Sequence, residues 1–201
     1  MTGSEGARPI AAVVLAGGES RRFGSDKLAA DLEGRTVLDR ALDGLPPEAA
    51  IAVVGPQRPI DRAAAFLRED PPGGGPAAGL VAGLTWATDR GAERILVLPG
   101  DAPGAGRAAR LLLAALDAPG VTAAVGSDGS GREQVLQLAL LPSAAYALIA
   151  AAGVDRGHGQ SVRRLLARLT PAPQPVPLPE ELTDDIDTVE QLRHFRNSNR
   201  T

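Results

Sequence analysis

The sequence predicts an α/β fold, a single three-layer Rossmann-like domain with a mostly parallel central sheet. Short, mostly apolar runs lead into segments with glycine or proline, which is typical of strands buried on both faces of a sheet. Segments with helical spacing of apolar residues lie between these runs, and this alternation favours parallel strands covered by helices. The length of 201 residues favours one domain, since a domain holds roughly 150 residues.

Apolar runs predict the strands of the sheet. The run at 10–15 is followed by Ala16-Gly17-Gly18, and the run at 95–98 is followed by Pro99-Gly100-Asp101. In an open parallel sheet ligands bind beyond the carboxyl ends of the strands, so we expect these glycines and acids at the binding edge. The predicted strands are residues 10–15, 50–54, 95–98, 121–125 and 135–141.

Helical spacing predicts the layers that cover the sheet. Ser143 and Ser161 open two of these helices, where a serine oxygen accepts hydrogen bonds from free backbone N–H groups. Residues 170–179 hold five prolines and form either an extended connector or an edge segment, since proline cannot donate to a sheet ladder. The predicted helices are residues 37–45, 60–67, 79–88, 105–116, 143–152, 161–169 and 187–196.

The ends of the chain are expected to lie outside the domain. Residues 9–196 form the predicted domain, between a disordered tail at 1–8 and a frayed tail at 197–201. No apolar run reaches the roughly 18 residues that span a bilayer, and the N-terminus lacks the apolar stretch of a secretory signal. We therefore expect a cytoplasmic protein without a membrane partner, acting as a monomer or a weak homo-oligomer.

The composition excludes several classes of function. Aromatic residues make up only 2%, so the core must be aliphatic. The 21 basic and 24 acidic residues leave a net charge of −3, whereas a surface that coats nucleic acid is basic. The absence of cysteine excludes disulfides, thiolate zinc sites and a cysteine nucleophile, and two histidines are too few for most zinc sites.

The segment between Leu15 and Lys27 carries the strongest signal, LAGGESRRFGSDK. Its glycines let backbone N–H groups approach and surround phosphate oxygens, and Arg21, Arg22 and Lys27 add positive charge. The segment matches neither GxxxxGK[ST] nor GxGxxG. Taken alone, the glycines fit a simple turn before a solvated basic face equally well.

The whole string, LAGGxSxRFGxDK, resembles the opening signature of the molybdenum cofactor guanylyltransferases, a family of molybdopterin nucleotidyltransferases within the NTP-transferase superfamily. The resemblance continues in the order of the family and covers about residues 10–195. Ala77 stands where the family has leucine in GPLAGL, and Ala102 where it has methionine in GDMP. The later matching segments are residues 69–80, 97–103, 131–140 and 185–192.

This resemblance implies transfer of GMP from GTP to molybdopterin-bound molybdenum cofactor, giving the guanine dinucleotide cofactor and pyrophosphate. It implies a requirement for Mg²⁺ or Mn²⁺, and it adds molybdenum cofactor assembly proteins or acceptor enzymes as partners. Three alternatives stay open: a cytidylyltransferase making the cytosine dinucleotide cofactor, another NTP:phosphate nucleotidyltransferase, and a nucleotide-binding domain without catalysis.

The resemblance also implies roles for individual residues. Lys27, Arg21 and Asp101 are the implied catalytic residues, with Lys27 at the reacting phosphate and Arg21 at the leaving pyrophosphate. Asp101 and Asp187 are the implied metal ligands, and hard carboxylate oxygens suit magnesium. The implied nucleotide-binding residues are Leu15, Ala16, Gly17, Gly18, Lys27, Asp70, Gly79 and Asp101.

Two positions separate the guanylyl and cytidylyl alternatives. Asp187 stands where the guanylyltransferases usually carry asparagine, and an aspartate is more similar to their cytidylyl and sugar-nucleotide relatives. Gly17 points the other way, since LAGG is typical of guanine-specific members and LAAG of cytidylyl members. From residue type alone, Asp101 also fits a turn before Pro103, Asp187 a helix N-cap, and Asp70 a solvated loop acid.

Overall fold

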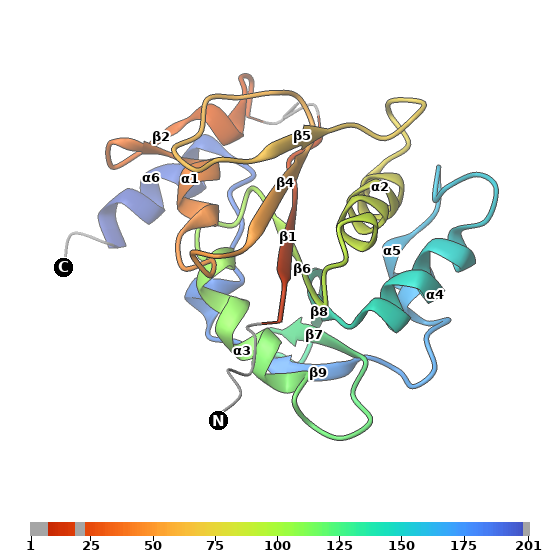
Figure 1. The fold of residues 1–201 in the computed structure, drawn as a ribbon. Coiled ribbons are helices and arrows are strands. Elements are labelled where there is room, and N and C mark those ends of the chain that lie inside the picture. The colour runs from red at the N-terminus through yellow and green to blue at the C-terminus, as the bar shows by residue number, and fades with distance from the viewer. Residues whose placement is uncertain (1–7, 19–22, 199–201) are drawn as a thin grey trace, which may run out of the picture.

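A seven-stranded sheet runs through the middle of the molecule, with the order β5-β4-β1-β6-β8-β7-β9 (Figure 1). The computed structural model describes residues 8–18 and 23–198. The sheet strands are β1 (Ile10–Leu15), β4 (Ala50–Val54), β5 (Ala65–Leu67), β6 (Arg94–Pro99), β7 (Ala123–Ser127), β8 (Glu133–Leu140) and β9 (Gln174–Pro177). Every apolar run predicted as a strand is confirmed, and the first two have the predicted bounds.

Most neighbouring strands are parallel, as predicted. β1 pairs with β4 and β6, β4 pairs with β5, and β7 pairs with β9, all in parallel register. β8 is the exception, because it runs antiparallel to both β6 and β7. β9 lies at the sheet edge, so the proline-rich segment is an edge segment, where an absent N–H is tolerated.

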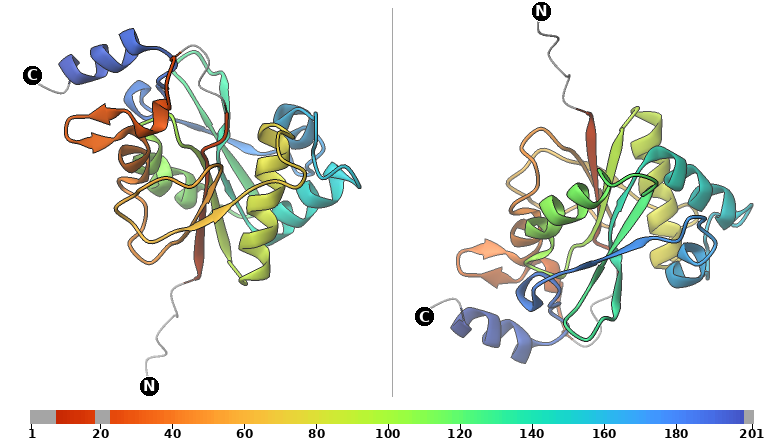
Figure 2. Two further views of the ribbon diagram at one scale, coloured as in Figure 1. Left: turned by 90° about the horizontal axis from the view of Figure 1, so that it is seen from above. Right: turned by 90° about the horizontal axis from the view of Figure 1, so that it is seen from below.

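Helices cover both faces of this sheet (Figure 2). One face carries α2 (Pro76–Asp89), α4 (Pro142–Ala152) and α5 (Val162–Leu166). The other carries α1 (Val37–Leu42), α3 (Ala109–Ala115), α6 (Val189–Ser198) and the hairpin of β2 (Asp31–Leu32) and β3 (Arg35–Thr36). Single 3₁₀ turns occur at η1 (Lys27–Ala29), η2 (Ala105–Ala108) and η3 (Glu180–Leu182). The predicted three-layer α/β fold is confirmed.

The central strand shows why apolar runs form this sheet. Side chains alternate along a strand, and on β1 Ala12 and Val14 pack with the core under α1 and α3. Ala11 and Val13 pack with the core under α2 and α4. Burial on both faces leaves no place for a polar side chain in β1, and the core is aliphatic as the composition predicts.

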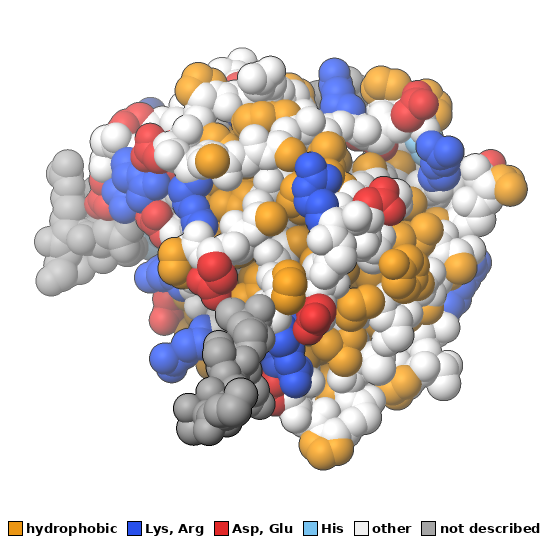
Figure 3. Space-filling model, in the orientation of Figure 1, with side chains coloured by type: hydrophobic (Ala, Val, Ile, Leu, Met, Phe, Trp, Pro, Cys, Tyr) orange, Lys and Arg blue, Asp and Glu red, His pale blue; other side chains and the backbone are white. Residues whose placement is uncertain are grey.

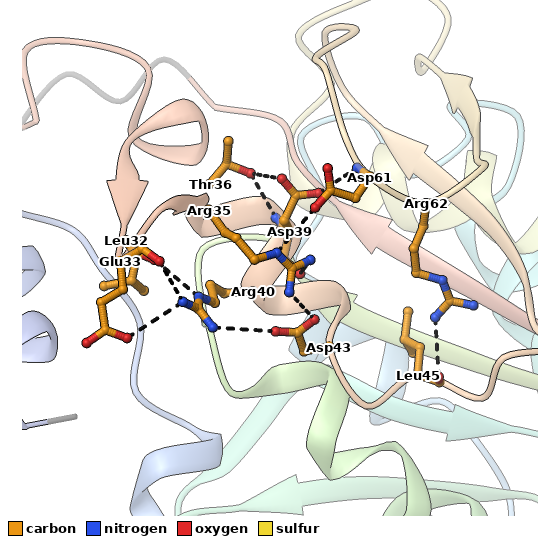
Figure 4. Close-up of polar contacts among 10 residues, drawn as sticks. All are labelled: Leu32, Glu33, Arg35, Thr36, Asp39, Arg40, Asp43, Leu45, Asp61 and Arg62. Atoms are coloured by element: carbon orange, nitrogen blue, oxygen red, sulfur yellow. Dashed lines mark hydrogen bonds and ion pairs between the residues drawn. The ribbon is translucent and has the colours of Figure 1, made fainter. Parts of the chain in front are cut away.

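The expected helix at residues 60–67 is wrong. Residues 61–62 form a bend, residues 63–64 have no regular secondary structure, and Ala65–Leu67 form β5. Tertiary contacts hold this segment against α1 (Figure 4): the Asp61 N–H donates to Asp39 Oδ1 at 2.9 Å, and Arg62 donates to the Leu45 carbonyl at 3.2 Å. Short apolar runs of this length do not distinguish a strand from a helix, and here pairing with β4 decides.

The serine caps expected at two helices are also wrong. Helix α4 begins at Pro142, one residue before Ser143, and a proline at the first helical position leaves no N–H that needs a partner. Ser161 does precede α5, but its side chain makes no capping hydrogen bond among the described residues.

Other sequence expectations concern the chain ends and the surface. The expected tails at 1–8 and 197–201 lie largely outside the described residues, and α6 continues to Ser198. Within the described part of the chain, no helix is both long and apolar enough to cross a membrane. Acidic and basic side chains are interspersed over the face in Figure 3.

Close packing of α2 on β1 gives a stability test of this fold. A Cβ atom added to Gly83 lies 2.1 Å from Val13 Cγ1, so Gly83→Ala must displace the central strand or the helix. We expect a net loss of about 1–2 kcal/mol in the free energy of unfolding, since overpacking outweighs the better helix propensity of alanine. Gly129→Ala is the control, because open space surrounds that position. Equal denaturant midpoints for both variants would contradict this packing.

Candidate functional site at the carboxyl edge of the sheet

Four parallel strands end at one level on the same edge of the sheet. Leu15 at the end of β1 pairs with Val54 on β4 and with Pro99 on β6, and Val54 pairs with Leu67 on β5. The segments that follow these strands therefore leave the sheet side by side. They hold Gly17, Asp70 and Asp101. The expected placement of Gly17 and Asp101 beyond the carboxyl ends of the strands is confirmed, and Asp70 lies beyond the same edge.

Lys27 contacts both of the aspartates predicted to bind metal, Asp101 and Asp187. It lies in η1, and its Nζ contacts Asp101 Oδ2 at 2.7 Å and Asp187 Oδ1 at 2.8 Å. Burial lowers the pKa of Lys27, but hydrogen bonds and charges from Asp101 and Asp187 outweigh burial, and the net effect is a raised pKa. The ammonium is therefore a fixed positive charge at neutral pH and not a general base.

A third carboxylate, Asp185, completes the acidic group. One oxygen each of Asp101, Asp185 and Asp187 lie within 4.8 Å of one another. The Ile186 N–H donates to the Asp101 carbonyl at 2.9 Å, and the buried Ile186 side chain separates the two neighbouring aspartates. This backbone contact holds the C-terminal segment beside β6 and places Asp187 opposite Lys27.

The charges of this group fit a divalent cation. Burial raises the pKa of Asp185, the nearby Asp187 and Asp101 carboxylates raise it further, and Lys27 partly offsets these effects. Burial is the largest cause of this raised pKa, and repulsion between the neighbouring carboxylates is the second. Hard oxygen donors around a cation are the ligands that magnesium prefers.

The capping alternative for Asp187 is wrong, because Thr188 caps α6. Thr188 Oγ1 accepts from the Gln191 N–H at 3.2 Å, and Gln191 Oε1 accepts from the Thr188 N–H at 2.9 Å. This reciprocal pair is a capping box. The Asp187 carboxylate is directed at Lys27 instead.

The glycine-rich segment begins directly beyond β1. Ala16 is buried, Leu15 is half-buried, and Gly17 and Gly18 are exposed. Gly18 has φ of +111°, a conformation that favours glycine. Gly79 lies buried in α2, and a Cβ atom there would lie 3.5 Å from Leu15 Cδ2, in ordinary contact. Gly79 therefore packs behind Leu15.

The structure does not bring Asp70 into contact with Lys27 or with the three carboxylates. Asp70 is exposed, and among the described residues its carboxylate has no hydrogen bond or ion pair. Arg21 lies outside the described residues, as does its neighbour Arg22.

Sequence reasoning missed Asp185, Asp26 and Arg58. Asp185 is signalled by its spacing, because side chains two residues apart on an extended segment share a side. Asp26 directly precedes Lys27, and its carboxylate accepts from Arg58 at 2.6 Å. Arg58 has no signal in the sequence, since its partners Asp26 and Ala16 lie 32 and 42 residues away.

Known proteins are similar to this chain in sequence and in fold. Residues 12–173 match the family described as MobA-like NTP transferase domain. A molybdenum cofactor guanylyltransferase of Shewanella halifaxensis is 36% identical over 142 residues, which cover 67% of this chain and 68% of the relative. The molybdenum cofactor guanylyltransferase of Acidiphilium cryptum is 42% identical over 110 residues, which cover 51% of this chain and 56% of the relative.

The fold is also similar to a solved structure, that of molybdopterin-guanine dinucleotide biosynthesis protein A from Archaeoglobus fulgidus. The TM-score is 0.67 at 20% identity, over 94% of this chain and 98% of that chain. In sequence, the chain spans about half the length of several of the curated relatives that it matches.

Proposed function

This chain belongs to the MobA-like NTP transferase family, and on that premise we propose that it transfers GMP from GTP to molybdopterin-bound molybdenum cofactor. A terminal phosphate oxygen of the acceptor attacks the α-phosphorus of GTP. A new bond forms between that oxygen and the α-phosphorus, the bond to the β-phosphate oxygen breaks, and pyrophosphate leaves. The products are the guanine dinucleotide cofactor and pyrophosphate.

The observation that carries this proposal is the position of Lys27 between Asp101 and Asp187, at the edge where the glycine-rich segment begins. In nucleotidyl transfer the protein positions the reacting groups and neutralises the negative charge of the phosphates. Lysine suits this task as a compact charge on a flexible stem. We assign Lys27 to the reacting phosphate, where its ammonium exchanges carboxylate oxygens for phosphate oxygens.

The remaining nucleotide contacts follow from the exposed surface of the same edge. The backbone N–H groups of Gly17 and Gly18 face the triphosphate, with Leu15 and Ala16 forming the floor and Gly79 supporting Leu15 from behind. The exposed Asp70 carboxylate accepts hydrogen bonds from ribose hydroxyls or from the guanine edge. Arg21 is assigned to the leaving pyrophosphate.

Asp101 and Asp187 are the proposed ligands of Mg²⁺ or Mn²⁺, with Asp185 beside them. When bound, such an ion neutralises phosphate charge and orients the phosphates. The backbone hydrogen bond from the Ile186 N–H to the Asp101 carbonyl supports this assignment, because it keeps the two carboxylates close enough to reach one cation.

The proposed function also includes the acceptor substrate, the protein partners and the cellular compartment. The substrates are GTP and molybdopterin-bound molybdenum cofactor, with molybdenum cofactor assembly proteins or acceptor enzymes as partners, in the cytoplasm. The test is incubation of the protein with GTP, Mg²⁺ and the acceptor, followed by mass spectrometry of the product. Formation of the guanine dinucleotide supports the proposal, and unchanged acceptor beside intact GTP refutes it.

A cytidylyltransferase is the second candidate, favoured by aspartate at position 187. Asp187 contacts Lys27, and both belong to the phosphate and metal region. A residue in that region affects the reaction rate and does not discriminate between guanine and cytosine. We therefore base the choice between GTP and CTP on Gly17. A glycine without Cβ lets a purine lie against the backbone.

We accordingly expect GTP to be used over CTP by at least about tenfold in kcat/KM, or roughly 1.4 kcal/mol. Gly17→Ala should narrow this ratio. The variant suits the test because an added Cβ lies 4.0 Å from its nearest neighbour, the Val54 carbonyl, and leaves the fold unstrained. Steady-state kinetics with both nucleotides give the ratio. Equal or better use of CTP by the unmutated protein would transfer the assignment to the cytidylyl alternative.

A further inference from the structure

Arg58 is bound at both ends of the glycine-rich segment. Its Nη1 donates to the carbonyls of Ala16 at 3.0 Å and Pro56 at 3.1 Å, and its Nε donates to Asp26 Oδ2 at 2.6 Å. Only 8% of the Arg58 side chain is exposed. We propose that Arg58 is a positioning residue for nucleotidyl transfer, which fixes the Gly17 N–H at one end of the segment and Lys27 at the other. This inference rests on the proposed function.

At the first end, the contact sets the orientation of a peptide group. In a trans peptide the C=O and the following N–H point in opposite directions. The Ala16 carbonyl is directed at Arg58, so the Gly17 N–H points away from Arg58. The Ala16 N–H donates to Val54 at 2.8 Å, and Gly55 lets the chains approach, because a Cβ atom there would lie 2.4 Å from the Ala16 oxygen.

At the second end, the contact acts through Asp26. One oxygen of this carboxylate accepts from Arg58, and the other accepts from the Leu28 N–H at 3.2 Å and so caps the 3₁₀ turn that begins with Lys27. Burial raises the pKa of Asp26, but hydrogen bonds and charge from Arg58, with backbone N–H groups, lower it overall. The carboxylate is charged at neutral pH and holds the turn in register with Arg58.

Arginine is the residue that this geometry requires. Its planar guanidinium presents several N–H donors in a fixed fork, whereas a lysine ammonium is a single point of charge. One rigid group thus sets the spacing between Ala16 and Asp26. Loss of that spacing misplaces both the Gly17 N–H and the Lys27 ammonium, and a displacement of about 1 Å costs on the order of 100-fold in rate.

Arg62 provides a matched control. It also donates to backbone carbonyls, those of Leu45, Pro46 and Pro47 at 3.2, 3.0 and 3.3 Å, but these lie beside α1 and not at the glycine-rich segment (Figure 4). Arg58→Gln and Arg62→Gln both remove guanidinium hydrogen bonds to backbone carbonyls, and Arg58→Gln also removes the ion pair with Asp26. Arg58→Lys retains the charge beside Asp26 and loses the fork.

The experiment combines kinetics with amide hydrogen exchange. For Arg58→Gln we expect kcat/KM with GTP to fall about 10- to 100-fold, with partial recovery in Arg58→Lys and a change below about twofold in Arg62→Gln. Exchange should accelerate at residues 16–18 and 23–28 in Arg58→Gln alone. Asp26→Asn keeps an oxygen that can cap the 3₁₀ turn. The double variant Arg58→Gln/Asp26→Asn should therefore have nearly the same kcat/KM as Arg58→Gln alone, because both changes remove the same contact.

These readouts separate the inference from the proposed function. Similar values for Arg58→Gln and Arg62→Gln in exchange or in kcat/KM would overturn the positioning role. If the unmutated protein transferred no nucleotide, the proposed function would fail. Exchange at residues 16–18 and 23–28 would then decide by itself whether Arg58 fixes the segment.

Discussion

Lys27→Ala is expected to lower the turnover of nucleotidyl transfer by about 10²–10³ while the protein remains folded. The substitution removes a preorganised positive charge at the reacting phosphate, and losses of this kind have that magnitude. The pKa of Lys27 is raised above the ordinary lysine value of 10.5, so the ammonium stays charged throughout the neutral pH range. The ammonium loses its proton, and with it the ion pairs, as the pH rises through this raised pKa. The effect should therefore be constant between about pH 6 and 9.

Arg94→Ala is the control for this variant. Arg94 pairs with Asp117, and its side chain is 14% exposed, against 13% for Lys27. It lies at the start of β6, whereas Asp101 follows the opposite end of that strand. Arg94→Ala should change melting temperature without a comparable loss of turnover. Near-normal turnover of folded Lys27→Ala would mean that the glycine-rich segment has been misread.

Removal of divalent metal should abolish transfer, because the carboxylates at this site are hard-cation ligands. Activity should disappear in excess chelator and return with Mg²⁺ or Mn²⁺. A second readout uses the protein without substrates: electron paramagnetic resonance should detect Mn²⁺ bound to the unmutated chain, and binding should weaken in Asp101→Asn. Full activity in excess chelator would show that the role assigned to Asp101 is wrong.

Asp101→Asn should also reduce turnover by about 10²–10³, because an amide loses the charge that contacts Lys27 and that we propose to hold the cation. Asp61→Asn is a suitable comparison, since Asp61 is exposed and contacts Arg35 at 3.3 Å, beside α1. It should leave turnover unchanged.

The strands were predictable because they are buried on both faces. Residues 10–15 and 50–54 are wholly apolar and are followed by Ala16-Gly17-Gly18 and by Gly55-Pro56, so the pattern alone gives their bounds. The conformation of residues 60–67 was not predictable. Asp61 and Arg62 make hydrogen bonds to α1 and to the residues after it, and the local spacing of apolar residues does not encode these contacts.

The residues of the candidate site also differ in how far the sequence could predict them. The position of Asp101 at the edge of the sheet was predictable because it directly follows a buried strand. Lys27 was selected because it closes a distinctive string of residues, and the structure shows its contact with Asp101. Arg58 was not predictable, since its role depends on two contacts that only the folded chain brings together. The capping box at Thr188 was readable in principle, as a threonine followed three residues later by glutamine.

The most direct test of nucleotidyl transfer at this site is pyrophosphate release, measured separately with GTP, CTP, ATP and UTP, each with and without molybdopterin-bound molybdenum cofactor. The proposed reaction predicts release from GTP that requires both the acceptor and divalent metal and that nearly disappears in Asp101→Asn. Absence of release with all four nucleotides in the presence of acceptor and metal, or release that is unchanged in Asp101→Asn, would contradict it.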